Sequence, residues 1–142
     1  MTATTLPMSM TVPGVGDAVP LARHWVRLVL GTAGCVMLDD ALLTVSELVG
    51  NAVKHSQSGS TGGLVTVVIG YQGPEMTRIT VIDDGGATVP MPREPNHDLL
   101  DVSGRGLWLV NSVCRAWGVT DTDGGRRAVW ALIPVADKVC DT

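Results

Sequence analysis

Three polar residues that can do acid–base or metal chemistry recur at intervals of four, at Glu47, Asn51 and His55. This interval places side chains on one face of an α-helix. A carboxylate can accept the proton of an attacking hydroxyl group, and an amide oxygen is a hard ligand that suits Mg²⁺. Asparagine is a poor helix former, so a mid-helix position favours a use for its amide. Spacing alone nevertheless favours the simpler interpretation, a solvated helix face, because such short motifs often match by chance.

Glycines accompany charged residues at two further points. Asp83 and Gly85 follow an apolar stretch, where a carboxylate could accept from an exocyclic amine and glycine would let a flat ring approach the backbone. The alternative is an ordinary Asp-Gly turn. Gly104-Arg105-Gly106 precedes a helical pattern, and the free N–H groups at a helix start suit a phosphate, to which Arg105 would add charge-assisted hydrogen bonds. This segment, too, can be interpreted as an N-terminal turn and nothing more.

The elements that must position these residues follow from hydrophobic periodicity. Apolar spacing predicts helices from Asp17 to Gly31, over residues 38–55, and from Gly104 to Trp117, where Gly118 ends the third helix. The predicted strands are residues 6–12, 64–71, 76–82, 119–122 and 128–135. Residues 84–103 have no periodicity and predict a functional lid. Strands that are neighbours in sequence favour a two-layer α/β sandwich, of the α+β type, with a mostly antiparallel sheet.

Composition narrows the class of protein. A chain of 142 residues with 45% hydrophobic residues predicts one folded domain and excludes a disordered chain. The absence of a long apolar run and of a secretory signal predicts a cytoplasmic protein without a membrane span. A net charge of −4 with scattered cations disfavours nucleic acid as a ligand. Three widely spaced cysteines argue against a disulfide framework and against a zinc site.

The order of these motifs carries a family resemblance. The sequence resembles the GHKL (Bergerat-fold) ATPase superfamily, and within it the anti-sigma factor and serine-protein kinase branch of Gram-positive bacteria. The matching segments are residues 46–56, 81–85 and 103–110, and the resemblance runs from about Val12 to Pro134. It implies a single ATP-binding domain over residues 1–142, with a mostly antiparallel sheet covered on one face by about three helices and a lid at about residues 84–103.

The resemblance assigns the polar face of the second helix to the phosphates of ATP. Glu47 would be the general base that takes the proton of an attacking serine hydroxyl. Asn51 would ligate the Mg²⁺ that bridges the phosphates, with Lys54 and His55 near the same region. ATP and Mg²⁺ are therefore the implied cofactors.

The remaining matched positions would bind the adenine base and the phosphates that lie under the lid. Asp83 would accept from the adenine amino group, and Gly85 would form the floor of the ring pocket. The phosphates would be cradled under the lid by the beginning of the third helix, which comprises Gly104, Arg105, Gly106 and Leu107.

The implied function is that of an anti-sigma factor and serine/threonine kinase that phosphorylates an anti-anti-sigma (STAS-type) partner and forms a homodimer. A module that binds ATP and a partner without transferring phosphate is the alternative. Ala87 stands where the family has a second glycine, and Ala128 where it often has a threonine beside the adenine site. These two departures keep the alternative open, whereas Glu47 and Asn51 favour the kinase.

Overall fold

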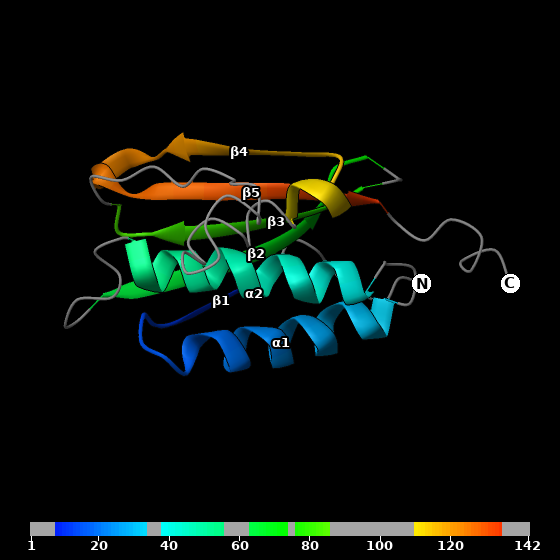
Figure 1. Ribbon diagram of the computed structural model, residues 1–142, viewed down its shortest axis with the longest axis horizontal. Coiled ribbons are helices and arrows are strands. Elements are labelled where there is room, and N and C mark those ends of the chain that lie inside the picture. The colour runs from blue at the N-terminus through cyan, green and yellow to red at the C-terminus, as the bar shows by residue number, and fades with distance from the viewer. Residues whose placement is uncertain (1–7, 34–37, 56–62, 74–75, 86–109, 135–142) are drawn as a thin grey trace, which may run out of the picture.

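Five strands and two long helices contain most of the residues that the structure describes, which are 8–33, 38–55, 63–73, 76–85 and 110–134. In this computed structural model the elements follow one another as β1 (Met8–Pro13), α1 (Ala18–Ala33), α2 (Leu38–His55), β2 (Leu64–Tyr71), β3 (Met76–Asp83), β4 (Ala116–Asp121) and β5 (Arg127–Pro134). Figure 1 shows α1 and α2 side by side as one layer and the strands as a second layer. The predicted two-layer α+β fold class is confirmed.

The five strands form one sheet in the order β1-β2-β3-β5-β4, and every pairing is antiparallel. The first strand, β1, lies at an edge of the sheet. The β2–β3 and β4–β5 pairs join strands that follow one another in the chain. The β1–β2 and β3–β5 pairs join strands that are distant in sequence, and the β3–β5 pair lies between the two groups of strands.

Buried residues alternate with more exposed ones along β2 and β3, and this alternation distinguishes the two faces of the sheet. Every second residue of β2 and of β3 is buried, and those of β2 are Val65, Val67 and Ile69. The helices cover this face, and the central part of α2 contributes Val45, Leu48 and Val49 to the same cluster. Fully buried aliphatic side chains thus fix α2 across the sheet, and burial on this scale contributes about 1.5–3 kcal/mol for each large side chain.

The predicted third helix is wrong at its C-terminal end. Helix is described only over residues 110–113, and Gly104 to Leu109 lie outside the described residues. Trp117 and Gly118, predicted as the end of the helix, lie in β4, which begins at Ala116 rather than at residue 119. Pairing with β5 replaces helical hydrogen bonds, since Arg115 N donates to Leu132 O at 2.8 Å. Tertiary pairing overrides a helical apolar period that continues past residue 113 by coincidence.

The face of the sheet away from the helices carries a stacked pair. The Arg78 guanidinium lies 4.7 Å from the centroid of the Trp130 ring. Gly118 is the register partner of Trp130 on β4, and a Cβ atom on Gly118 would lie 2.6 Å from Cζ2 of that ring. The indole ring therefore occupies space that only glycine leaves open. No helix in the described part of the chain has the length and apolar character needed to cross a membrane.

We expect Gly118→Ala to lower the free energy of unfolding by about 1–3 kcal/mol, because the new methyl group must displace the Trp130 ring. Urea unfolding followed by tryptophan fluorescence measures this change. Gly31→Ala on α1 is the control, because a Cβ there meets no atom within 4 Å and alanine is the better helix former. A Gly118→Ala protein as stable as the wild type would contradict the inference that the Trp130 ring needs glycine at this position.

Candidate functional site

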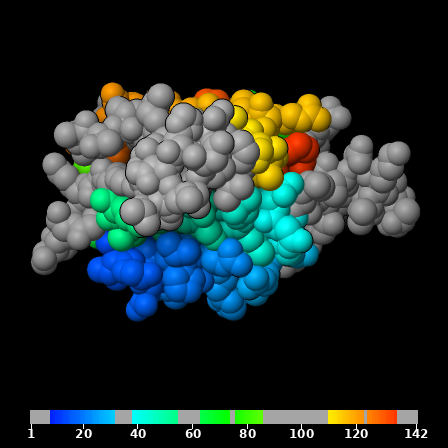
Figure 2. All heavy atoms as spheres, viewed as in Figure 1, coloured from blue at the N-terminus to red at the C-terminus, as the bar shows by residue number. Residues whose placement is uncertain are grey.

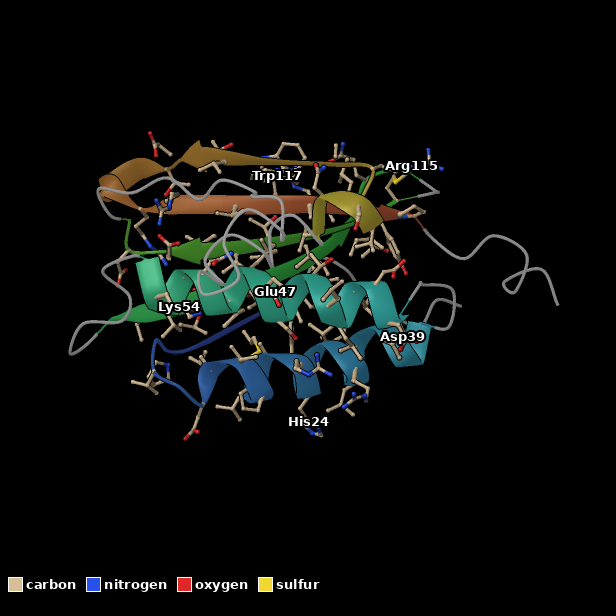
Figure 3. All side chains as sticks on the ribbon, viewed as in Figure 1. His24, Asp39, Glu47, Lys54, Arg115 and Trp117 are labelled. Atoms are coloured by element: carbon tan, nitrogen blue, oxygen red, sulfur yellow. The ribbon has the colours of Figure 1, made fainter. Side chains whose placement is uncertain are left out.

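The last residues of α2 and of β3, His55 and Asp83, lie at one end of the molecule. Figure 1 shows the C-terminal ends of α2 and β3 at the same end, near the beginning of β5, and α2 packs directly on β3. Figure 3 places Glu47 near the middle of α2 and Lys54 toward its C-terminal end, and His55 is the last residue of the helix. In the space-filling view of the same side, the atoms of α2 lie between those of α1 and those of the C-terminal segments coloured yellow to red (Figure 2).

The polar face of α2 is not fully solvated. Glu47 and Asn51 are each half-buried, whereas Lys54 is exposed. The Nδ2 atom of Asn51 is buried and has no hydrogen-bond partner among the described residues. A buried amide without a partner costs free energy, about 1–3 kcal/mol, and such groups are usually satisfied by a ligand or by water. This burial favours a use for the amide over the solvated-face interpretation.

A hydrogen-bond chain between the helices holds the turn of α2 next to Glu47. Arg23 on α1 donates from Nη1 to Ser46 Oγ at 2.7 Å, and Ser46 Oγ donates in turn to Leu42 O at 2.7 Å. Ser46 immediately precedes Glu47. The contact was not predicted, although Arg23, which lies next to Ala22 in the apolar pattern of the first helix, was a usable signal.

Asp83 ends the buried row of β3 and is a buried carboxylate. Its residue is 1% exposed, and Oδ1 accepts a hydrogen bond from Gly85 N at 2.7 Å. The Arg127 Nε lies 3.6 Å from the same oxygen. Burial raises the pKa of the Asp83 carboxyl, while the Gly85 hydrogen bond and the Arg127 charge oppose that rise. The group is thus an acceptor removed from water, as recognition of a base amine requires.

The turn after Asp83 is both an Asp-Gly turn and a close contact. Gly85 has a φ of 79°, and a Cβ atom there would overlap the carbonyl oxygen of Gly125 in the β4–β5 connection. Among the described residues, it is therefore the backbone of Gly125 that leaves no room for a side chain at residue 85. Its predicted role beneath a nucleotide ring stays a prediction.

Arg127 is the site residue that sequence reasoning missed. Ala128 was expected beside Asp83, but it is the register partner of Ile82, whereas Asp83 pairs with Arg127. Paired residues share a face of the sheet, and a shift of one residue exchanges the faces. Ala128 therefore lies on the opposite face from Asp83. Only the tandem Arg126-Arg127 at the start of the last strand could have pointed to this contact.

Several predicted site residues lie outside the described part of the chain. They are Gly104, Arg105, Gly106 and Leu107, together with residues 86–103 of the predicted lid. Within the described residues, no three His, Cys, Asp or Glu side chains form a group that could hold a metal ion.

Comparison with known proteins gives concordant results. Residues 14–132 match the histidine kinase-like ATPase domain family. The serine-protein kinase RsbW of Staphylococcus aureus (strain JH9) is 28% identical over 118 residues, which cover 75% of this chain and 74% of the relative. The same protein from strain Newman gives the same values, 28% over 118 residues.

A solved structure shares the fold. It is the crystal structure of the RsbU and RsbW domains of Rv1364c from Mycobacterium tuberculosis, with a TM-score of 0.65 and 21% identity. The match covers 92% of this chain but 33% of that chain, so this chain spans about a third of the solved protein's length. A likeness at this identity supports the arrangement of elements and nothing further.

We expect Gly85→Ala to lower the free energy of unfolding more than Gly124→Ala does. Both glycines have positive φ, 79° and 80°, so both substitutions carry the backbone cost of about 1–2 kcal/mol. Only at Gly85 would the Cβ atom also collide with backbone, whereas at Gly124 it meets nothing within 4 Å. Chemical unfolding of the two variants isolates the close contact, and equal losses would show that the contact contributes nothing.

Proposed function

The chain belongs to the histidine kinase-like ATPase domain family, and we propose that it binds ATP and acts as an anti-sigma factor with serine/threonine kinase activity. Its partners are a sigma factor and an anti-anti-sigma protein of the STAS type, the second of which receives the phosphate. We further propose that it works in the cytoplasm as a homodimer. The resemblance to serine-protein kinases named RsbW supports this assignment.

The buried carboxylate of Asp83 is the observation that carries the nucleotide-binding proposal. It ends a central strand, it is held by the Gly85 N–H group, and that end of β3 lies at the same end of the molecule as the C-terminal end of α2 (Figure 1). An acceptor in a low-dielectric environment forms a stronger hydrogen bond than one in water. Asp83 accordingly accepts from the exocyclic amine of adenine.

Asn51 fits a role at the phosphates. Its buried amide has one nitrogen without a described partner, and its oxygen supplies a hard ligand for a divalent cation. Mg²⁺, when bound with ATP, neutralises charge on the phosphates. Lys54 follows Asn51 by three residues on the same helix and adds a positive charge in this proposal. Gly104, Arg105, Gly106 and Leu107 complete the phosphate site in this proposal.

Glu47 acts as the general base in the proposed transfer. A carboxylate has no attraction for a triphosphate. The position of Glu47 one turn from Asn51 is therefore explained if Glu47 acts as a proton acceptor. The serine or threonine hydroxyl of the partner gives its proton to Glu47, its oxygen bonds to the γ-phosphorus, and the bond from that phosphorus to ADP breaks. Phosphoryl transfer needs little from the protein beyond such positioning and charge neutralisation.

A second candidate is a module that binds ATP and a partner without transferring phosphate. It is favoured by the departures from the family pattern at the base end, where Arg127 faces Asp83 and Ala87 replaces a glycine. Phosphoserine mass spectrometry of candidate anti-anti-sigma proteins after incubation with the protein and Mg-ATP distinguishes the two. ATP binding without any phosphorylated partner would establish the module.

We expect Asp83→Asn to weaken ATP and ADP binding equally, because both nucleotides share the adenine contact. The loss of one charge-assisted hydrogen bond costs about 1.5–3 kcal/mol, or about ten- to a hundredfold in affinity. Isothermal titration calorimetry measures the effect. Asp84→Asn is the matched control, because the Asp84 carboxylate accepts instead from Leu64 N at 3.1 Å. Unchanged ATP affinity in folded Asp83→Asn protein would refute the base site.

We expect Glu47→Gln to retain Mg-ATP and partner binding while phosphorylation falls by about 10²–10⁴-fold, the usual contribution of a positioned base. Asn51→Ala should weaken Mg-ATP binding as well. Asp39→Asn, at the opposite end of the same helix (Figure 3), is the control and should leave the transfer rate unchanged. A Glu47→Gln protein that transfers phosphate at the wild-type rate would show that another group is the base.

A further inference from the structure

A buried ion pair lies at the end of β3 where the proposed base site begins. Arg127 and Asp83 are 3% and 1% exposed and face each other in register across β3 and β5. The Arg127 Nε is 3.6 Å from Asp83 Oδ1. Burying two charges costs desolvation energy, and a packed apolar pair is often at least as stable. The buried pair is therefore weak evidence of a purely stabilising role.

The contacts of the carboxylate are unevenly divided between its two oxygens. Oδ1 accepts the hydrogen bond of Gly85 N at 2.7 Å and is also the oxygen nearest to Arg127. The Gly85 contact is a hydrogen bond, whereas the Arg127 contact at 3.6 Å is an ion pair without a hydrogen bond from Nε, so the Oδ1 side of the carboxylate faces the Gly85 N–H group and the guanidinium. Among the described residues both contacts end on this one atom, and Oδ2 is the oxygen that we assign to a ligand.

A carboxylate that offers one oxygen discriminates between the purines. Adenine presents a single exocyclic amine at C6, whereas guanine has a carbonyl there and presents two adjacent N–H donors, at N1 and at N2. Two parallel donors match the two oxygens of an unencumbered carboxylate in a bidentate pair. A single available oxygen satisfies the adenine amine but leaves one guanine donor unpaired, which is costly in a buried site.

We propose that Arg127 is a positioning residue that holds Asp83 through Oδ1, presents Oδ2 to the base, and thereby makes the site select adenine over guanine. The inference rests on the proposed function, in which Asp83 binds the base. Arg127 acts through the carboxylate and does not touch the nucleotide. Its charge also favours the ionised form of Asp83 against the effects of burial and of the neighbouring Asp84, which both raise the pKa of that carboxyl.

Calorimetry with ADP and GDP on the full chain tests this role. We expect Arg127→Met to lower ADP affinity about tenfold, the scale of one charge-assisted contact, and to lower the ADP-to-GDP affinity ratio by about tenfold or more. Arg127→Lys should restore both values to within about threefold of the wild type, because it keeps the charge. Arg126→Met removes the adjacent arginine instead and should change neither value.

A double-mutant cycle separates positioning from a merely structural effect. In the Asp83→Asn background, Arg127→Met should change ADP affinity by less than about twofold, since its target is already absent. A further tenfold loss there would mean that Arg127 contacts the nucleotide or shapes the pocket, and would overturn the proposal. This comparison also decides the case if Arg127→Met alone fails to fold, because the double variant leaves no unpaired buried charge between the two positions.

The outcomes distinguish this inference from the proposed function. Absence of ADP binding by the wild type, or unchanged ADP binding by Asp83→Asn, would refute the base site itself. If the wild type binds ADP and Asp83→Asn weakens it, but folded Arg127→Met keeps the wild-type ADP-to-GDP ratio, only the role of Arg127 is refuted.

Discussion

The antiparallel pairing of β3 with β5 is the constraint on which the rest of the structure depends. It is a central contact of the sheet, and it joins strands that are distant in sequence. The β1–β2–β3 strands on one side and the β4–β5 hairpin on the other become one sheet only through it. The same register places Arg127 opposite Asp83, so the charge environment of the candidate base site follows directly from the closure of the sheet.

The helix layer supplies the other half of the site by a separate route. Leu48 and Val49 pack into the core from α2, and this anchoring fixes the rotation of the helix about its axis. Glu47 and Asn51 are thereby held half-buried rather than in open solvent. The Arg23 hydrogen bond to Ser46 links α1 to the same turn. Glu47, the proposed general base, is therefore supported by the core on one side and by α1 on the other.

The site is composite, and each part alone has an ordinary structural explanation. The Asp83-Gly85 segment is a turn stabilised by its own side chain, and Gly85 is required by the approach of the Gly125 backbone. These structural roles do not compete with binding. A turn that holds a carboxylate rigid and buried also pre-organises that carboxylate as an acceptor, which lowers the cost of binding a ligand.

The sequence by itself determined the local elements, because periodicity and glycine positions act over a few residues. It predicted α2 over 38–55, placed Asp83 directly after an apolar strand, and ordered the motifs of an ATPase family. Only the tertiary structure decided that Trp117 belongs to β4 and that Arg127, not Ala128, faces Asp83. Strand register depends on partners far away in the chain, and a shift of one residue reverses which side chains meet.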